Sequence, residues 1–404
     1  MTKELWRQLC LRRWAPCKPP SVVLGTQTWK QYYLCRSELE FRVESGRPQD
    51  FVCKAISGHT GQIDQLAYVS PNEYRFDGGA KSVVCTVSSD CTVRAWDLHE
   101  GTEIWSSPVQ PAPLVSLVAY PQLQLVVTVD TQGLIIVWKA ETGCEQASFC
   151  LPTSSSAMEA CDHPDGTFLL VRKIQQDTLQ EAAPPSVHSD HTEMFPQVFH
   201  TQSLPHQSED KSPVSTTFPI RQSSRACWAP DEAARLMVMH RDDRGTQLVV
   251  TTFELKTKKS RDRVNILAQQ LASFPLPDTM MPHLMQGHGS QMILLASRSE
   301  LVLFTIHGLQ LVAFQDHQRP ITSMWVDLNR VITSSLDLSL RVYVWNKENK
   351  LPVLKSCYHL LGGSHRWASG FTHVKSDSMS IAGVEARSSG TSILRSYYYK
   401  VQLG

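Results

Sequence analysis

A histidine, a serine and an aspartate in the first quarter of the chain are of the types that a hydrolase uses. His59 follows Gly58, and Ser88 and Asp90 lie further along in SSDCTVRAWD. In a Ser-His-Asp set the histidine takes the serine proton while the aspartate orients the imidazole. No Gly-x-Ser-x-Gly elbow frames Ser88, and no nearby sequence predicts a loop of oxyanion donors. The pattern therefore favours a structural use of these side chains, and we expect no catalytic residue.

The three side chains belong to a repeated unit. VCTVSSDCTVRAWDLHEG (84–101) aligns with VVTVDTQGLIIVWKAETG (126–143) at an offset of 42 residues, which matches Trp96 with Trp138. This offset lies within the period of about 40–45 residues that four-stranded propeller blades have. Short alternating or apolar runs separated by turn residues indicate an antiparallel all-β fold.

Weaker copies of the unit continue to the end of the chain. They occupy residues 158–171, 225–239, 292–306, 316–349 and 379–401. FVCKAI (51–56) precedes the first unit, and by pairing with the last one it would remove exposed sheet edges. We therefore predict a seven-bladed β-propeller over residues 51–404, with six or eight blades as alternatives.

Two segments fall outside the repeat. Residues 1–50 predict helices, first over 1–16 and then, after a Pro-rich break, in a helical linker over 17–50. Residues 175–222 are rich in Pro, Ser, Gln and His and have no apolar period. We expect a long disordered loop there.

The composition argues against several classes of partner. Lys plus Arg (39) nearly balance Asp plus Glu (38), so the basic excess of a nucleic-acid binder is missing. The eleven cysteines form no CxxC pair, and the histidines of 175–222 lack the rigid surroundings that a metal site needs, so no metal is expected. No apolar run approaches the ~18 residues of a membrane span. We expect no nucleic-acid or membrane partner and a location in the cytoplasm or the nucleus.

The motifs of the first unit resemble the WD40 repeat. They are Gly-His at 58–59, SSD at 88–90 and TVRAWD at 92–97, and the resemblance extends over residues 51–404. The segment ELWRQLCLRRW (4–14) resembles the last helix of an F-box, with Leu5, Trp6 and Leu9 as its apolar positions. Residues 28–64 resemble the linker between F-box and propeller. The chain is thus similar to F-box/WD-repeat proteins, with the N-terminal part of the F-box missing.

The resemblance implies a role for the opening residues. In WD40 repeats an Asp in a turn binds the His of the Gly-His pair, which contacts a strand Ser or Thr and then the Trp indole. Carried over, this structural network comprises His59, Ser88 (or Thr86), Asp90 and Trp96. A second copy comprises His317, Asp337 and either Tyr343 or Trp345, since both aromatics share a strand face. In the second unit Pro111 and Gln132 occupy the His and Asp positions, so no polar network is expected there.

The resemblance also indicates where a target would bind. In relatives that recognise phosphorylated peptides, arginines directly follow the apolar residue that opens each innermost strand. Here the matching residues are Asp64, Ser116 and Thr322, which form our candidate target-binding face. None of them is basic, so recognition of phosphate by arginines at these positions is not expected.

By resemblance, the chain is a protein-interaction module without catalytic activity or cofactor. It would be the substrate-recognition subunit of an SCF-type E3 ubiquitin ligase, with the F-box bound to Skp1 and the cullin complex and the propeller bound to an unknown protein substrate. The alternative is a WD40 scaffold without ligase attachment, because the F-box is incomplete.

Overall fold

The structure of the protein is a computed structural model. It describes residues 3–14, 28–72, 74, 76, 81–150, 156–161, 168–173, 197–200, 215–218, 220, 223–229, 234–242, 244–260, 263–346 and 352–400. The chain forms two compact units, which are described separately. Unit 1 comprises Met1–Pro152, Asp316–Trp325 and Asn329–Gly404, and unit 2 comprises Thr153–Gln315 and Val326–Leu328.

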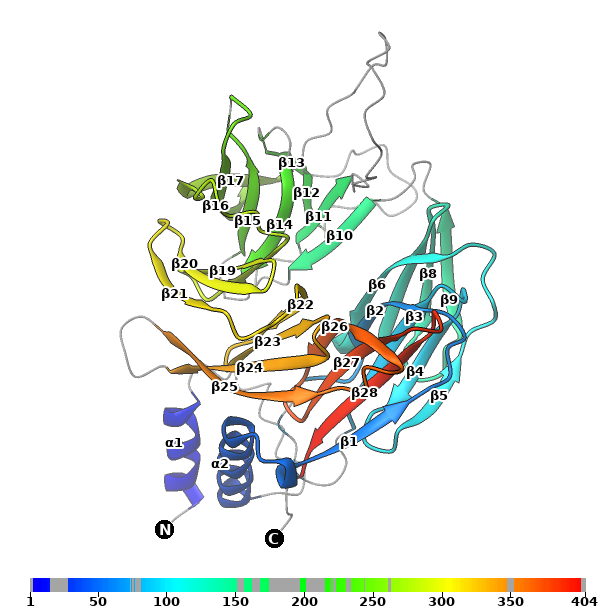
Figure 1. The fold of residues 1–404 in the computed structure, drawn as a ribbon. Coiled ribbons are helices and arrows are strands. Elements are labelled where there is room, and N and C mark those ends of the chain that lie inside the picture. Colours follow the sequence, from blue (N-terminus) through cyan, green and yellow to red (C-terminus); the bar gives the residue numbers. More distant parts are fainter. Residues whose placement is uncertain are drawn as a thin grey trace. The chain divides into compact units, whose positions relative to one another are not determined.

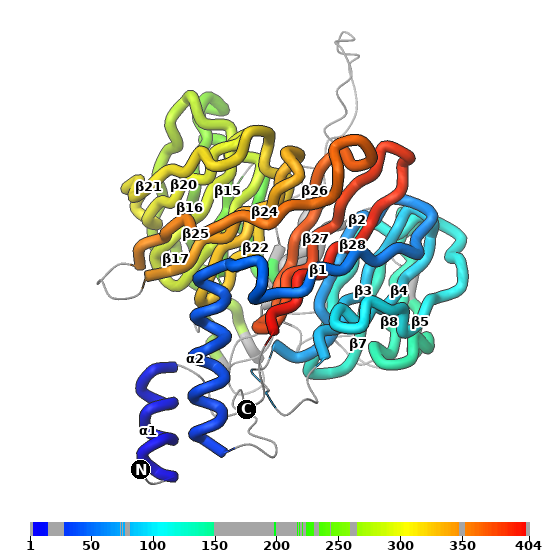
Figure 2. The backbone as a smooth tube through the Cα atoms, turned by 60° about the horizontal axis from the view of Figure 1, so that its bottom comes forward, coloured from blue at the N-terminus to red at the C-terminus, as the bar shows by residue number. Residues whose placement is uncertain are grey.

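Two helices lie in the segment predicted to be helical. They are α1 (Lys3–Arg13) and α2 (Trp29–Ser45), which lie side by side in Figures 1 and 2. A capping box starts α2: Thr28 Oγ1 accepts from Gln31 N at 3.2 Å, and Gln31 Oε1 accepts from Thr28 N at 3.0 Å. Gly46, in the left-handed conformation, ends the helix. A 3₁₀ turn (Pro48–Asp50) then leads into the first strand.

Unit 1 contains four four-stranded sheets. Two are consecutive in sequence: β2 (Ile63–Tyr68), β3 (Val83–Ser88), β4 (Val93–Asp97), β5 (Thr102–Ser106), then β6 (Leu114–Tyr120), β7 (Leu125–Asp130), β8 (Leu134–Lys139), β9 (Glu145–Cys150), with a 3₁₀ turn (Pro121–Leu123) after β6. The third is β22 (Ile321–Val326), β23 (Arg330–Ser335), β24 (Ser339–Asn346), β25 (Val353–Leu361). The fourth joins β26 (Ala368–Ser376), β27 (Ser380–Arg387), β28 (Ser392–Tyr399) and β1 (Phe51–Ile56).

Unit 2 contains three four-stranded sheets. They are β10 (Ser156–Cys161), β11 (Phe168–Lys173), β12 (Gln197–His200), β13 (Ser215–Thr217); β14 (Ser223–Ala229), β15 (Ala234–Arg241), β16 (Leu248–Ser260), β17 (Arg263–Pro275); and β18 (Leu284–His288), β19 (Met292–Ser297), β20 (Glu300–Thr305), β21 (Gln310–Phe314). Central strands such as β19 and β20 are apolar and buried along nearly their whole length, as expected of strands covered on both faces.

One of the sheets is not formed from four consecutive strands. Six of them use four consecutive strands, whereas the remaining sheet has only β26–β28 in sequence and is completed by β1. β1 pairs antiparallel with β28 from Phe51 opposite Tyr399 to Ile56 opposite Leu394. The predicted pairing of residues 51–56 with the last unit is therefore confirmed, and it covers the free edge of β28.

The prediction of an unbroken loop over 175–222 was wrong in two places. β12 and β13 fall inside this segment, and β12 pairs with both β11 and β13. At four and three residues, these strands are too short to show alternation in the sequence. Most of the other residues of 175–222 lie outside the described part.

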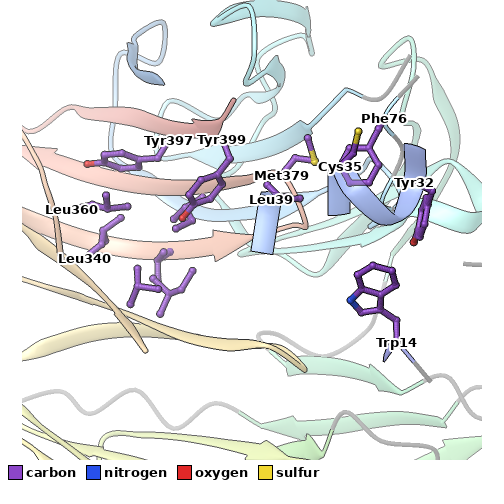
Figure 3. Packing of buried hydrophobic residues seen from close by; sticks show 14 of the residues in the cluster. Trp14, Tyr32, Cys35, Leu39, Phe76, Leu340, Leu360, Met379, Tyr397 and Tyr399 are labelled. Atoms are coloured by element: carbon purple, nitrogen blue, oxygen red, sulfur yellow. The ribbon is translucent and has the colours of Figure 1, made fainter. Parts of the chain in front are cut away.

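One apolar cluster joins the helices to the sheets of unit 1. Figure 3 shows side chains of this cluster, which includes Trp14, Tyr32 and Leu39 of the N-terminal segment and Tyr397 and Tyr399 of β28. The same cluster takes in buried side chains of β23–β27, and Phe76 from the β2–β3 connection, so the helices share a core with the propeller strands. Within the described residues, no helix is both long and apolar enough to cross a membrane.

Candidate functional site

The opening residues form a hydrogen-bonded chain within the β2–β5 sheet. His59 Nδ1 lies 2.8 Å from Asp90 Oδ2, and His59 Nε2 lies 2.8 Å from Thr86 Oγ1. The Trp96 indole Nε1 donates to the same Thr86 oxygen at 2.8 Å. We call these four residues the His59 network. It ties the loop before β2 to the turn between β3 and β4 and to the β4 tryptophan.

The protonation states of this network follow from burial and hydrogen bonding. Burial lowers the pKa of His59, although its bond to Asp90 acts in the opposite direction. Burial alone would raise the pKa of Asp90, but the hydrogen bonds from Thr92 and His59 outweigh burial and lower it to about 2. A neutral histidine therefore donates from Nδ1 to the ionised Asp90 and accepts from the Thr86 hydroxyl at Nε2.

Of the two hydroxyl residues predicted for the network, Thr86 belongs to it and Ser88 does not. Trp96 lies opposite Val84 in the strand pairing, so its indole reaches diagonally to Thr86, two residues along. Ser88, two residues further, accepts instead from the backbone N of Asp90 at 3.2 Å. Thr86 is fully buried, so the hydroxyl that the histidine contacts is enclosed and does not face a substrate.

A second copy of the network lies in the β22–β25 sheet. His317 bridges Asp337 Oδ2 at 2.9 Å and Thr333 Oγ1 at 2.7 Å. Of the two predicted aromatics, Tyr343 occupies the place of Trp96, because it lies opposite Val331 and is hydrogen-bonded to Thr333. Trp345 is buried two residues further along the strand.

The β6–β9 sheet keeps part of this network, although we expected no polar network there. Trp138 Nε1 donates to Thr128 Oγ1 at 2.9 Å, as Trp96 does to Thr86. At the turn, Asp130 Oδ1 accepts from the backbone N of Gln132 and of Leu134 at 2.9 and 2.8 Å. The tryptophan–threonine bond therefore persists where the histidine is lost.

Two hydroxyls that the sequence reasoning overlooked complete the copies. Thr92 Oγ1 donates to Asp90 Oδ1, and Ser339 Oγ donates to Asp337 Oδ1, both at 2.6 Å. The signal was present in the sequence as a Ser or Thr two residues after each aspartate. These bonds occupy the second carboxylate oxygen and hold each turn in place.

Comparison with known proteins places the chain in a family. No protein-family model matches it. It is 33% identical over 422 residues to F-box/WD repeat-containing protein 12 of Homo sapiens, a match that covers 97% of this chain and 90% of that protein. The chain belongs to the F-box/WD repeat-containing protein family. F-box/WD repeat-containing protein 15 of Mus musculus is 28% identical over 388 residues, covering 88% of this chain and 82% of that protein.

A solved structure supports the fold of this F-box/WD repeat chain. The WD40 β-propeller domain of Doa1 superimposes with a TM-score of 0.50 at 13% identity, covering 86% of this chain and 96% of that domain. The fold is therefore that of a WD40 β-propeller preceded by a short helical segment.

The predicted target-binding residues of this F-box/WD repeat protein are not all equivalent. β2 carries one extra residue, Asp64, because Ile63 lies opposite Ser88 and Gln65 lies opposite Val87. In β6 the extra residue is Val115, so matching Ser116 with Asp64 was wrong by one residue. The misalignment arose because Leu114 and Val115 are both apolar, and either could open the strand.

The positions equivalent to Asp64 carry no basic residue in unit 1. In each sheet, the equivalent position lies two residues after a residue whose carbonyl oxygen accepts a hydrogen bond from a backbone N in a turn of the same sheet. The carbonyls are those of Gln62, Pro113, Pro320 and Trp367, and the positions are Asp64, Val115, Thr322 and Ser369. Burial and the nearby Asp90 raise the pKa of Asp64, and the Thr322 hydroxyl donates to Phe371 O at 2.7 Å.

The predicted F-box residues differ in exposure. Leu5 is 39% exposed. Trp6 and Leu9 are half-buried, and the Trp6 ring lies 5.5 Å from that of Tyr33 on α2. Among the described residues, no group of three or more His, Cys, Asp or Glu side chains could hold a metal ion.

Proposed function

We propose that this chain is the substrate-recognition subunit of an SCF-type E3 ubiquitin ligase. It binds Skp1, and through it the cullin complex, with the α1 surface around Leu5, and it binds a protein target on the propeller. The chain itself carries out no chemistry. The observation that carries the proposal is the shared core of helices and propeller strands in a member of the F-box/WD repeat family.

The junction between helices and sheets suits this role because it holds them in one orientation. A Cβ at Gly46 would lie 2.1 Å from the Tyr358 ring of β25, so α2 ends directly against this strand. The Tyr358 hydroxyl lies 2.6 Å from that of Tyr399 on β28. A target held by the sheets would then keep a defined position relative to a partner held by the helices.

A cation sandwich strengthens the same junction. The Arg36 guanidinium of α2 lies 4.4 Å from the Trp14 ring centroid and 4.0 Å from that of Tyr74. The Tyr74 hydroxyl accepts from Asn329 Nδ2 at 3.0 Å, next to β23. The β2–β3 connection, which contains Tyr74, therefore links both helices to the β22–β25 sheet.

The test is capture of the purified chain on immobilised Skp1. The wild-type chain is expected to be captured, and Leu5→Glu is expected to abolish capture, because it places a charge on an exposed apolar side chain of α1. Leu123→Glu is the matched control, since Leu123 is 67% exposed in unit 1 but lies in the 3₁₀ turn after β6.

Equal capture of both variants would refute the α1 surface as the Skp1 site. If the wild-type chain is not captured at all, the ligase proposal fails and the alternative of a scaffold without ligase attachment takes its place.

A further inference from the structure

The loop from Leu361 to Trp367 presents two large apolar side chains to solvent. We call it the Trp367 loop. It connects β25 to β26, and Leu361 and Trp367 at its ends are 64% and 58% exposed. Burying either side chain against a partner would release apolar surface from water. The structural network and the helical junction use neither of them.

The backbone of this loop is held from several sides. Gly362 N donates to Leu338 O at 2.9 Å, Gly363 N donates to Glu385 Oε2 at 2.7 Å, and Trp367 N donates to Ser364 O at 3.0 Å. A Cβ at Gly363 would lie 2.6 Å from a guanidinium nitrogen of Arg395, so a larger residue there would have to displace the Arg395–Glu385 ion pair. The exposed tryptophan is thus presented by an ordered loop, which lowers the entropy lost on binding.

An arginine of the same loop lies beside the tryptophan. The Arg366 guanidinium lies 5.0 Å from the Trp367 ring centroid, an arrangement that leaves its N–H donors free to bind a carboxylate. His365 is also exposed. Arg319 is exposed in the loop before β22, and the turn at Leu336–Leu338 connects the two loops, because Leu336 N donates to Pro320 O and Leu338 O accepts from Gly362 N.

The acidic groups near this surface are already engaged. Glu385 is buried and accepts from Arg395 Nε at 2.5 Å. Asp337 accepts from Ser339 and from the backbone N of Gln318 within its own network. Asp316 Oδ2 accepts from Ser356 Oγ at 2.7 Å. Arg366 is exposed beside Trp367, whereas Glu385 is buried in an ion pair with Arg395.

We propose that the Trp367 loop, together with Arg319 of the loop before β22, is a docking surface for an acidic segment of a partner protein. A bulky apolar side chain of the segment packs on Trp367 and Leu361, and Asp or Glu carboxylates bind Arg366 and Arg319. Tryptophan and arginine are the residues that most often dominate binding energy at interfaces. The inference rests on the proposed function in taking this partner to be the target of the propeller.

The test is to select a phage library of random peptides on the purified full chain. Peptides that combine Asp or Glu with a bulky apolar residue are expected to be enriched. For the strongest of these, made as a fluorescent synthetic peptide, Trp367→Ala and Arg366→Ala should each raise the Kd at least about tenfold. Val109→Ala is the matched control, because Val109 is 74% exposed on the loop before β6, and it should leave the Kd unchanged.

Enrichment of neutral or basic peptides, no enrichment, or equal effects of Trp367→Ala and Val109→Ala would overturn the proposal. A requirement for phosphoserine in place of Asp and Glu in the synthetic peptide would also overturn it. Skp1 capture distinguishes the two proposals: a chain that binds the acidic peptide but not Skp1 refutes only the adaptor role, and the reverse result refutes only this surface.

Discussion

At the scale of single residues, Thr86 is where the His59 network is most easily broken. Thr86→Val would leave both His59 Nε2 and the Trp96 indole N–H buried without their shared partner, which should lower the free energy of unfolding by about 3 kcal/mol. Ser88→Ala, two residues away, loses one longer bond and should cost about 1 kcal/mol or less. Urea denaturation of both variants measures the difference, and equal losses would contradict the assignment of Thr86.

The protonation of His59 makes stability depend on pH at the same scale. Its folded pKa lies below the unfolded value of 6.5, so the unfolded chain binds the proton first as the pH falls. The free energy of unfolding should therefore fall as the pH drops below 6.5. Asp90 adds to the loss below 3.8, down to its folded pKa of about 2.

The measurement is the free energy of unfolding at pH values on either side of 6.5, for the wild type and for His59→Gln. The variant should lose less stability on acidification than the wild type. Half-buried His373, whose pKa desolvation lowers to about 4, acts in the same direction in both proteins and cancels in the comparison. Identical pH profiles would show that His59 is not the group that titrates.

At the scale of elements, the end of α2 tests how tightly the helices pack on the sheets. Gly46 and Gly245 both have positive φ, 58° and 71°, but a Cβ at Gly245 would meet nothing within 4 Å. Gly245→Ala should cost about 1 kcal/mol through backbone strain alone. Gly46→Ala should cost at least about 1 kcal/mol more, because the new methyl group overlaps Tyr358. Equal losses in thermal or urea denaturation would contradict the packing of α2 on β25.

The β2–β5 sheet depends in the same way on its tryptophan. Trp96 is 3% exposed, and Trp96→Ala should lower the free energy of unfolding by about 3–5 kcal/mol. Exposed Trp367 is the matched control, and Trp367→Ala should change stability by about 0.5 kcal/mol or less. A loss below about 1 kcal/mol for Trp96→Ala in urea denaturation would argue against a structural role for the network.

At the scale of the whole molecule, the sequence predicted those features that repeat or that span many residues. The 42-residue offset indicated four-stranded units, and the apolar segment 51–56 indicated the strand that completes the last sheet. Finer choices stayed open or were wrong where two residues had the same chemistry. Thr86 and Ser88 are hydroxyl residues on one strand face, and Leu114 and Val115 are adjacent apolar residues that only the bulge distinguishes.

The Trp367 loop could not have been found from the sequence. Its residues are ordinary in type. Its use depends on the exposure of Leu361 and Trp367, and on a turn of the β22–β25 sheet that is hydrogen-bonded both to this loop and to Pro320, next to Arg319. These facts arise only from the folded arrangement of two neighbouring sheets.

We propose that unit 1 carries two separate binding surfaces, one on α1 for Skp1 and one on the propeller for a target. The most direct measurement is simultaneous binding of purified Skp1 and the selected acidic peptide to the wild-type chain, to Leu5→Glu and to Trp367→Ala. We predict a ternary complex for the wild type, peptide without Skp1 for Leu5→Glu, and Skp1 without peptide for Trp367→Ala. The proposal would be contradicted if either variant lost both partners while remaining folded, or if both variants still bound both partners.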